Sequence, residues 1–305
     1  MSAILKVIVA MVTWGSLGVF VKNINLDSFE IAFLRALIAS FLLGIILIVN
    51  LKKENKSISS LYKSDDGLKK GLKLLIISGI AIGFNWVLLF KSYDYTTISN
   101  ATLSYYFAPV IVVFLSPIFL KEKFTIKRTV SVIIAMAGLI LIVKSQGELS
   151  QGEFNHMKGI VLALGAACLY ASVIMLNKFI KGFGDYERTF IQLFAGAIVL
   201  LPFIIFRGVL RIPDMKSLLN IIILGGLHTT VAYCLYFSAI KDLRAQSAAF
   251  LGYIDPVSAI FFSVVFLGEP LSVWQIIGGC IILIAAFVAE KKDKKEESKE
   301  FEIIQ

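Results

Sequence analysis

One acidic residue, Asp255, lies near the middle of a long apolar run that covers residues 245–267. A carboxylate inside such a segment is costly, so it is by default a candidate for function. Asp255 would bind an ammonium group or exchange a proton. The alternative is a neutral or Arg-paired carboxylate that only bridges helices. Arg35, inside run 29–49, is a second charged candidate that would hold a carboxylate, snorkel to the surface or serve a structural role.

Aromatic and neutral polar side chains inside apolar runs form a second candidate set. The aromatic members are Trp14, Trp86, Tyr106, Tyr170, Tyr233 and Tyr253, and the polar members are Asn85, Gln192 and His228. Aromatic faces stack apolar or cationic groups, and a neutral histidine is suited to proton traffic. Aromatic belts at membrane surfaces and hydrogen bonds between helices are the alternative explanations. We predict that the aromatic members line a cavity.

An internal repeat relates the two halves of the chain. The residues Ala101, Tyr106, Pro109, Val110, Phe114, Ser116, Phe119, Leu120 and Glu122 recur 147 positions later as Ala248, Tyr253, Pro256, Val257, Phe261, Ser263, Phe266, Leu267 and Glu269. The same register pairs Trp86 with Tyr233 and places Ala108 opposite Asp255, whereas Arg35 pairs with Gln192 at a spacing of 157. Transporters are commonly built from such repeats, with the substrate site at the repeat interface.

Composition places most of the chain in lipid. Hydrophobic residues make up 58% of the 305 residues, charged residues only 17%, and the mean hydropathy is +0.84. This is too much apolar surface for one soluble core of that length. Apolar runs lie near 5–21, 29–49, 72–90, 97–119, 129–143, 159–177, 189–206, 217–237, 245–267 and 273–289. We therefore predict an all-α polytopic membrane protein of ten spans, with nine as the alternative because the shortest run, 129–143, is of marginal length.

Five spans on each side of the loop at residues 144–157 make the repeat an inverted one, because an odd number reverses the direction of the second copy. With the N-terminus inside, 22 of the 30 basic residues fall in inside segments, 7 fall outside, and Arg35 lies within a span. The positive-inside rule then places both termini in the cytoplasm. This distribution explains the net charge of +9 without a nucleic-acid partner.

Small residues and caps indicate how the spans pack. Gly79 and Gly83 form a small-x-x-x-small face, and their repeat counterparts are Gly226 and Thr230. We expect both helices to approach a neighbour closely. Ser272 followed by Gln275 has the spacing of a capping box.

The chain resembles the drug/metabolite transporter superfamily, in particular its EamA-type ten-helix members. The resemblance is carried by Trp14 and Gly15, by Phe33 to Arg35, and by the segment from Pro109 to Thr125 with its copy from Pro256 to Ser272. It implies a secondary transporter of small metabolites, often an exporter, with a central cavity formed by helices of both halves.

We accordingly predict export of a small amphiphilic metabolite such as an amino acid across the cell membrane by alternating access, with a proton as a candidate coupling ion. The predicted units are a first repeat at 1–147, a second at 157–290 and a charged cytoplasmic tail at 291–305. The alternatives are a non-transporting membrane receptor or partner subunit, and a membrane-embedded enzyme. Neither a cofactor nor a metal is expected, because the three cysteines lie in separate spans. A second copy of the chain, in a homodimer, is a candidate partner.

Overall fold

The computed structural model describes residues 2–53, 66–120, 126–144, 155–206, 214–240, 251–252 and 254–290. Within these ranges the regular structure is helical and no strand occurs. The elements are α1 (Ala3–Lys22), α2 (Ser28–Lys53), α4 (Asp66–Ser92), α5 (Ile98–Tyr105), α6 (Ala108–Leu120), α7 (Ile126–Lys144), α9 (His156–Asn177), α10 (Asp185–Phe206), α11 (Met215–Ile223), η1 (Leu224–Val231), α12 (Ala232–Ile240), α14 (Ile254–Leu267) and α15 (Val273–Glu290). The candidate Tyr253 and the predicted tail at 291–305 lie outside the described residues.

The helices follow the predicted apolar runs. Among the described residues, six spans are long and apolar enough to cross a membrane, namely Ala3–Lys22, Ser28–Asn50, Gly67–Ser92, His156–Asn177, Asp185–Phe206 and Met215–Tyr236. Shorter apolar helices cover Ile254–Leu267 and Val273–Ala285. The short run at 129–143 lies within α7, which extends over 19 residues. The prediction of an all-α polytopic membrane protein is therefore confirmed.

Two predicted spans are not regular α-helices. The run at 97–119 divides into α5 and α6, with Tyr106 and Phe107 in a turn between them. Pro109 lacks the N–H that would continue the hydrogen-bond ladder through this turn, so the helix is interrupted just before it. In the run at 217–237, η1 is a stretch of π-helix, and Thr229 donates its hydroxyl to the Leu224 carbonyl five residues earlier. Such π-helical stretches occur frequently at functional sites.

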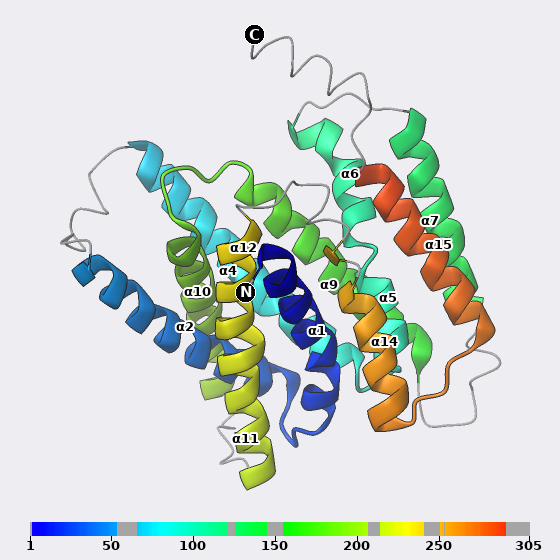
Figure 1. Ribbon diagram of the computed structural model, residues 1–305, viewed down its shortest axis with the longest axis horizontal. Coiled ribbons are helices and arrows are strands. Elements are labelled where there is room, and N and C mark those ends of the chain that lie inside the picture. The colour runs from blue at the N-terminus through cyan, green and yellow to red at the C-terminus, as the bar shows by residue number, and fades with distance from the viewer. Residues whose placement is uncertain are drawn as a thin grey trace.

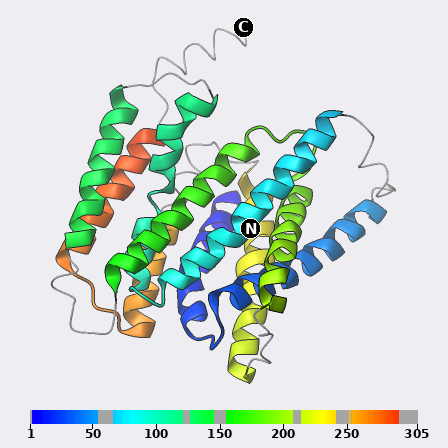
Figure 2. The ribbon, with the colours of Figure 1, turned by 180° about the vertical axis from the view of Figure 1, so that it is seen from behind.

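The helices form two groups that α1 and α9 connect (Figure 1). α7 packs along α15, with α6 and α14 on the same side of the molecule, while α2, α4, α10 and α12 lie on the other side. α1 contacts both α14 and α12, and α9 contacts α4 together with α5 and α6. Figure 2 shows α9 lying beside α4 when the molecule is viewed from behind. A site between the groups therefore has α1 and α9 among its walls.

The helix contacts of the first half recur in the second half. The contact of α1 with α14 matches that of α9 with α5 and α6, and the contact of α1 with α12 matches that of α9 with α4. Likewise, α2 packs on η1 as α10 packs on α4. Two further contacts, α2 with α10 and α7 with α15, each join repeat-related helices. The same arrangement of neighbours is thus present twice.

The predicted close approach is confirmed for the first half and shifted by one residue in the second. A Cβ at Gly79 would lie 2.3 Å from the Gln192 carbonyl oxygen, and one at Gly83 would lie 3.2 Å from that of Gly196, so α4 and α10 touch through their backbones. At Gly226 the nearest atom is 4.0 Å away, whereas a Cβ at the preceding Gly225 would meet Ile38 at 2.6 Å. The π-helical turns of η1 change which residue faces α2.

Because of this difference, we expect substitution by Ala to change stability in opposite ways at the repeat-related Gly79 and Gly226. Gly79→Ala should lower the free energy of unfolding by about 1–3 kcal/mol, because a backbone atom that cannot give way blocks the added methyl group. Gly226→Ala should leave stability unchanged or raise it, because the methyl group meets open space in a helix. Thermal unfolding of the two detergent-purified variants measures both effects. Equal melting temperatures would contradict the described α4–α10 contact.

Candidate functional site

A hydrogen bond joins two of the predicted site residues at the interruption between α5 and α6. The Tyr106 hydroxyl donates to Asp255 Oδ2 at 2.7 Å, and the Gly252 carbonyl lies 3.4 Å from the same hydroxyl. Asp255 occupies the first turn of α14, so this bond connects helices from the two sequence halves. No other hydrogen bond or ion pair holds Asp255 within the described residues, which leaves Oδ1 able to accept from a bound group.

Further aromatic residues gather around this pair. The Tyr105 ring lies 5.5 Å from that of Tyr170 and 6.4 Å from that of Tyr106. Tyr170 is also close enough to Tyr233, Tyr236 and Asp255 to interact with them electrostatically. Although helices of both halves surround it, Tyr170 keeps 40% of its surface accessible. Tyr170 is therefore not enclosed in a packed core.

Trp14 joins this group from α1. Its ring lies 5.2 Å from Tyr233 and 5.4 Å from Tyr236, and Nε1 donates to the His228 carbonyl at 2.8 Å. We call Trp14, Tyr105, Tyr106, Tyr170, Tyr233 and Tyr236 the aromatic set. Aromatic faces of this kind suit an apolar or cationic group.

His228 lies behind the aromatic set, with no accessible surface. One ring nitrogen, Nε2, is 2.9 Å from the Ser16 hydroxyl, and the ring lies 4.7 Å from that of Phe20. Nδ1 lies 3.3 Å from the Ile223 carbonyl. The imidazole therefore links α1 to η1 and supports Trp14 from the rear, without reaching the accessible space itself.

Arg35 is buried between α2, α4 and η1, with 4% of its surface accessible. Nε donates to Thr229 Oγ1 at 2.7 Å, and the guanidinium carbon lies 4.0 Å from the centre of the Trp86 ring. Arg35 and Asp255 do not form an ion pair. Trp86 thus holds the guanidinium and is not a member of the aromatic set.

Two predicted candidates serve as links between helices. Gln192 Nε2 donates to Ser78 Oγ at 2.8 Å and to Asn177 Oδ1 at 3.0 Å, which ties α10 to α4 and α9. Asn85 donates to the Ala166 carbonyl at 2.6 Å, which ties α4 to α9, and it lies close to Tyr105 of the aromatic set. Tyr105 and Tyr236 were not predicted. The proximity of Tyr105 to the turn before Pro109 is the signal that identifies it.

Several polar contacts join helix ends at one face of the bundle, where α1 ends, which we call the Lys22 face. Lys22 Nζ lies 2.5 Å from Glu269 Oε1, and Glu269 Oε2 accepts from the Ile98 amide at the start of α5. In addition, Gln275 donates to Asn100 Oδ1 at 2.6 Å. All three contacts cross between the two halves of the sequence.

The predicted capping box lies at the same face. Gln275 Oε1 accepts from the Ser272 amide at 2.7 Å, and Ser272 Oγ accepts from the Trp274 amide at 3.3 Å. This capping pair starts α15, as the sequence indicated.

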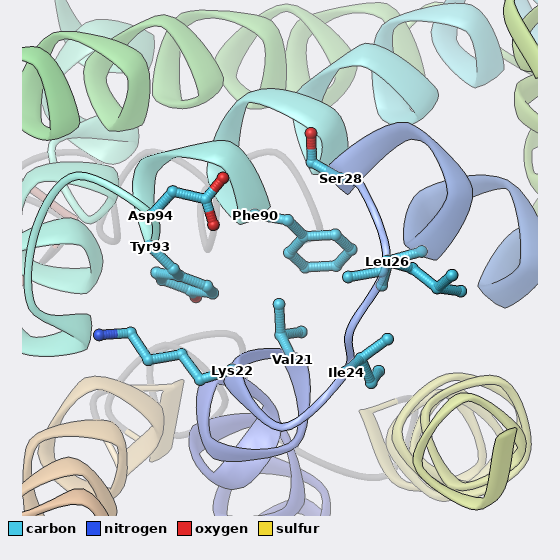
Figure 3. A pocket seen from close by; sticks show the side chains of 9 residues that line it. Val21, Lys22, Ile24, Leu26, Ser28, Phe90, Tyr93 and Asp94 are labelled. Carbon is cyan, nitrogen blue, oxygen red and sulfur yellow. The ribbon is translucent and has the colours of Figure 1, made fainter. Parts of the chain in front are cut away.

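A cavity of about 230 Å³ lies at the Lys22 face (Figure 3). It is lined by Val21, Lys22, Ile24, Leu26, Ser28, Ile31, Phe90, Tyr93 and Asp94. Phe90 borders this cavity and also lies 5.7 Å from the Arg35 guanidinium carbon. Phe90 therefore separates Arg35 from this cavity, and Tyr105 and Tyr233 of the aromatic set are near enough to Arg35 to interact with it electrostatically.

Comparison with known proteins identifies the class. The chain belongs to the EamA-like transporter family, whose pattern matches residues 1–144 and 157–290. It is thus a transporter of the drug/metabolite transporter superfamily, and the resemblance inferred from sequence is confirmed.

Individual relatives agree with this assignment. An uncharacterized transporter of Bacillus subtilis (strain 168), YxxF, is 32% identical over 94% of this chain and 88% of its own length. The protein RarD of Salmonella typhi is 24% identical over 87% of this chain and 86% of its own length. A solved crystal structure with 17% identity superposes with a TM-score of 0.63 over 94% of this chain and 97% of that one, which supports the fold.

The contact between Ser16 and the buried His228 can be tested by its effect on stability. Ser16→Ala should lower the free energy of unfolding by about 1–3 kcal/mol, because it leaves His228 Nε2 buried without a partner. Ser172→Ala is the control, since the partner of that hydroxyl among the described residues is the Leu169 carbonyl of its own helix. Thermal unfolding of both variants measures the difference. A Ser16→Ala protein as stable as the control would show that the contact with His228 contributes nothing.

Proposed function

We propose that the protein is a secondary active transporter that exports a small amphiphilic metabolite, such as an amino acid, across the cytoplasmic membrane. The observation that carries the proposal is the Tyr106–Asp255 hydrogen bond, which lies among accessible aromatic rings where helices of both halves meet. Aromatic faces suit an apolar body, and a carboxylate with an uncommitted oxygen suits an ammonium group or a proton. That the relative YxxF is named a transporter argues against the receptor and enzyme alternatives.

The proposed mechanism is alternating access between two inverted five-helix repeats, with both termini in the cytoplasm. The recurrence of the same helix contacts in both halves supports the repeat, and the bias of basic residues towards the proposed inside segments supports the orientation. In this orientation the Lys22 face is the outer face. The contacts there hold α1, α5 and α15 together, so we assign this structure to a state that is closed towards the outside.

The Lys22–Glu269 ion pair is the central contact of this closure. The two side chains keep 19% and 7% of their surface accessible, so the pair is shielded from solvent more than the nearby Lys91–Asp94 pair, at 37% and 56%. Glu269 also satisfies the Ile98 amide, which places a negative charge at the positive end of α5. Removing the ion pair should shift the protein towards the outward-open state.

Labelling from outside the cell tests the closure. In a protein in which Cys168, Cys234 and Cys280 are replaced by Ala, Tyr170→Cys places one thiol in the aromatic set. Lys22→Met and Glu269→Gln should each raise its reaction rate with a membrane-impermeant maleimide by about fivefold or more, since a partly buried pair is lost. The double variant should add little, because both changes break the same bond.

Lys91→Met is the matched control for this experiment. It removes an exposed outer-face cation that pairs with Asp94, and it should leave the rate unchanged because exposed pairs contribute little. Rates in Lys22→Met and Glu269→Gln equal to that of the control would refute the assigned closure.

Asp255→Asn separates a coupling role from a binding role. The substitution keeps the shape and removes the charge. If the carboxyl carries the coupling proton, transport driven by a pH gradient in vesicles should be lost, while counterflow exchange of substrate survives. If Asp255 binds the substrate, both activities should fail together. Normal transport by this variant over a range of pH would make Asp255 a structural residue.

A further inference from the structure

We propose that Arg35 binds a carboxylate of the transported molecule, so that the substrate class is small amphiphilic carboxylates. The proposal rests on the transport function and specifies its substrate.

Arg35 is a buried cation whose partners are all neutral. In the part of the chain that the structure describes, the ion pairs are those of Lys22 with Glu269 and of Lys91 with Asp27 and Asp94. The Arg35 side chain has instead a hydroxyl, Thr229 Oγ1, and two aromatic rings. A guanidinium keeps its charge in proteins, and a buried charge is stabilised best by an opposite charge. A bound anion would supply one.

The guanidinium is also held in a way that leaves donors available. Its Nε is the only nitrogen with a hydrogen-bond partner among the described residues. Thr229 is itself fixed by donating to the Leu224 carbonyl, and the guanidinium carbon is 4.0 Å from the Trp86 ring. The Nη1 and Nη2 groups, with four N–H bonds between them, therefore form a positioned fork without an acceptor. That fork matches the two oxygens of a carboxylate.

Charge favours a carboxylate over a phosphate. A phosphate monoester carries up to two negative charges near neutral pH. Lys22 is already paired with Glu269, and Asp94 lines the same cavity, so Arg35 is the cation that would face the ligand. A single guanidinium balances a monoanion. The aromatic set, two of whose members interact electrostatically with Arg35, would hold the apolar part of the molecule. Phe90 lies next to Arg35 and also lines the cavity in Figure 3.

Three probes of similar shape separate the two charged ends of the site. L-leucine carries an ammonium and a carboxylate, L-leucinamide only the ammonium, and 4-methylpentanoate only the carboxylate. Binding to purified full-length protein is measured by thermal stabilisation and by tryptophan emission, since Trp86 lies directly against Arg35. The wild-type protein should bind leucine and 4-methylpentanoate.

Arg35→Gln should weaken binding of leucine and 4-methylpentanoate about tenfold or more, because a charge-assisted hydrogen bond is lost, and should leave leucinamide unchanged. Arg35→Lys should give an intermediate loss, because it keeps the charge without the fork. Arg188→Gln is the control, since Arg188 donates to the backbone carbonyls of Phe183 and Ile180. It should bind the probes as the wild type does.

Thr229→Ala provides an independent test should Arg35→Gln fail to fold. It frees Nε and loosens the fork, and should weaken binding of 4-methylpentanoate severalfold without affecting leucinamide. Two results would overturn the proposal: no binding of 4-methylpentanoate or leucine to the wild type, or carboxylate binding that is unchanged in the folded Arg35 and Thr229 variants. If the Arg35 proposal fails in this way, transport of leucinamide or another non-carboxylate into vesicles would still support the proposed transport function.

Discussion

The lack of water in a bilayer core is the constraint on which the rest of the structure depends. Every polar group inside the bundle needs a partner within the protein, because an unsatisfied group in hydrocarbon costs several kcal/mol. Many of the described polar groups meet this requirement through long-range contacts such as Trp14 to the His228 carbonyl and Asn85 to the Ala166 carbonyl. Each of these bonds joins helices of different halves. Polar side chains therefore define how the halves fit together.

The same constraint gives meaning to the two places where the described chain departs from a regular α-helix. The regular helix is abandoned at the turn of Tyr106 and in η1, and these are the places where Asp255 and Arg35 find their partners. Backbone that departs from a regular helix within a membrane is tolerated where protein or a cavity surrounds it. The symmetric scaffold thus carries asymmetric chemistry, since the counterparts of Asp255 and Arg35 are the uncharged Ala108 and Gln192.

Sequence periodicity predicted the positions of the helices because apolar length is what the membrane selects. It also predicted that the helix of Gly79 and Gly83 approaches a neighbouring helix closely, because this approach depends only on small residues one turn apart. It failed at Gly226, because the wider turns of η1 have no signature in residue types. It likewise did not predict that Asp255 would bond Tyr106, or that Lys22 would meet Glu269, since both contacts depend on how distant helices pack.

The kinds of contact in the bundle also bear on how the proposed cycle can run. α4 and α10 meet through glycines and α7 packs along α15, and close packing of this kind resists gradual change. The Lys22 face is instead joined by hydrogen bonds and by ion pairs such as that of Lys22 with Glu269. The net contribution of each hydrogen bond is about 0.5–1.5 kcal/mol, because water can replace the lost partner at a membrane surface.

A face held in this way can separate without unfolding the packed groups on either side. In the proposed cycle, α1 and α9 contact both groups and are the helices whose positions must change relative to one of them. Breaking the contacts of Glu269 would release α1 from the start of α5, next to the cavity that Lys22 and Phe90 line. In the proposed cycle, the contacts of the Lys22 face therefore control access to the site at Arg35.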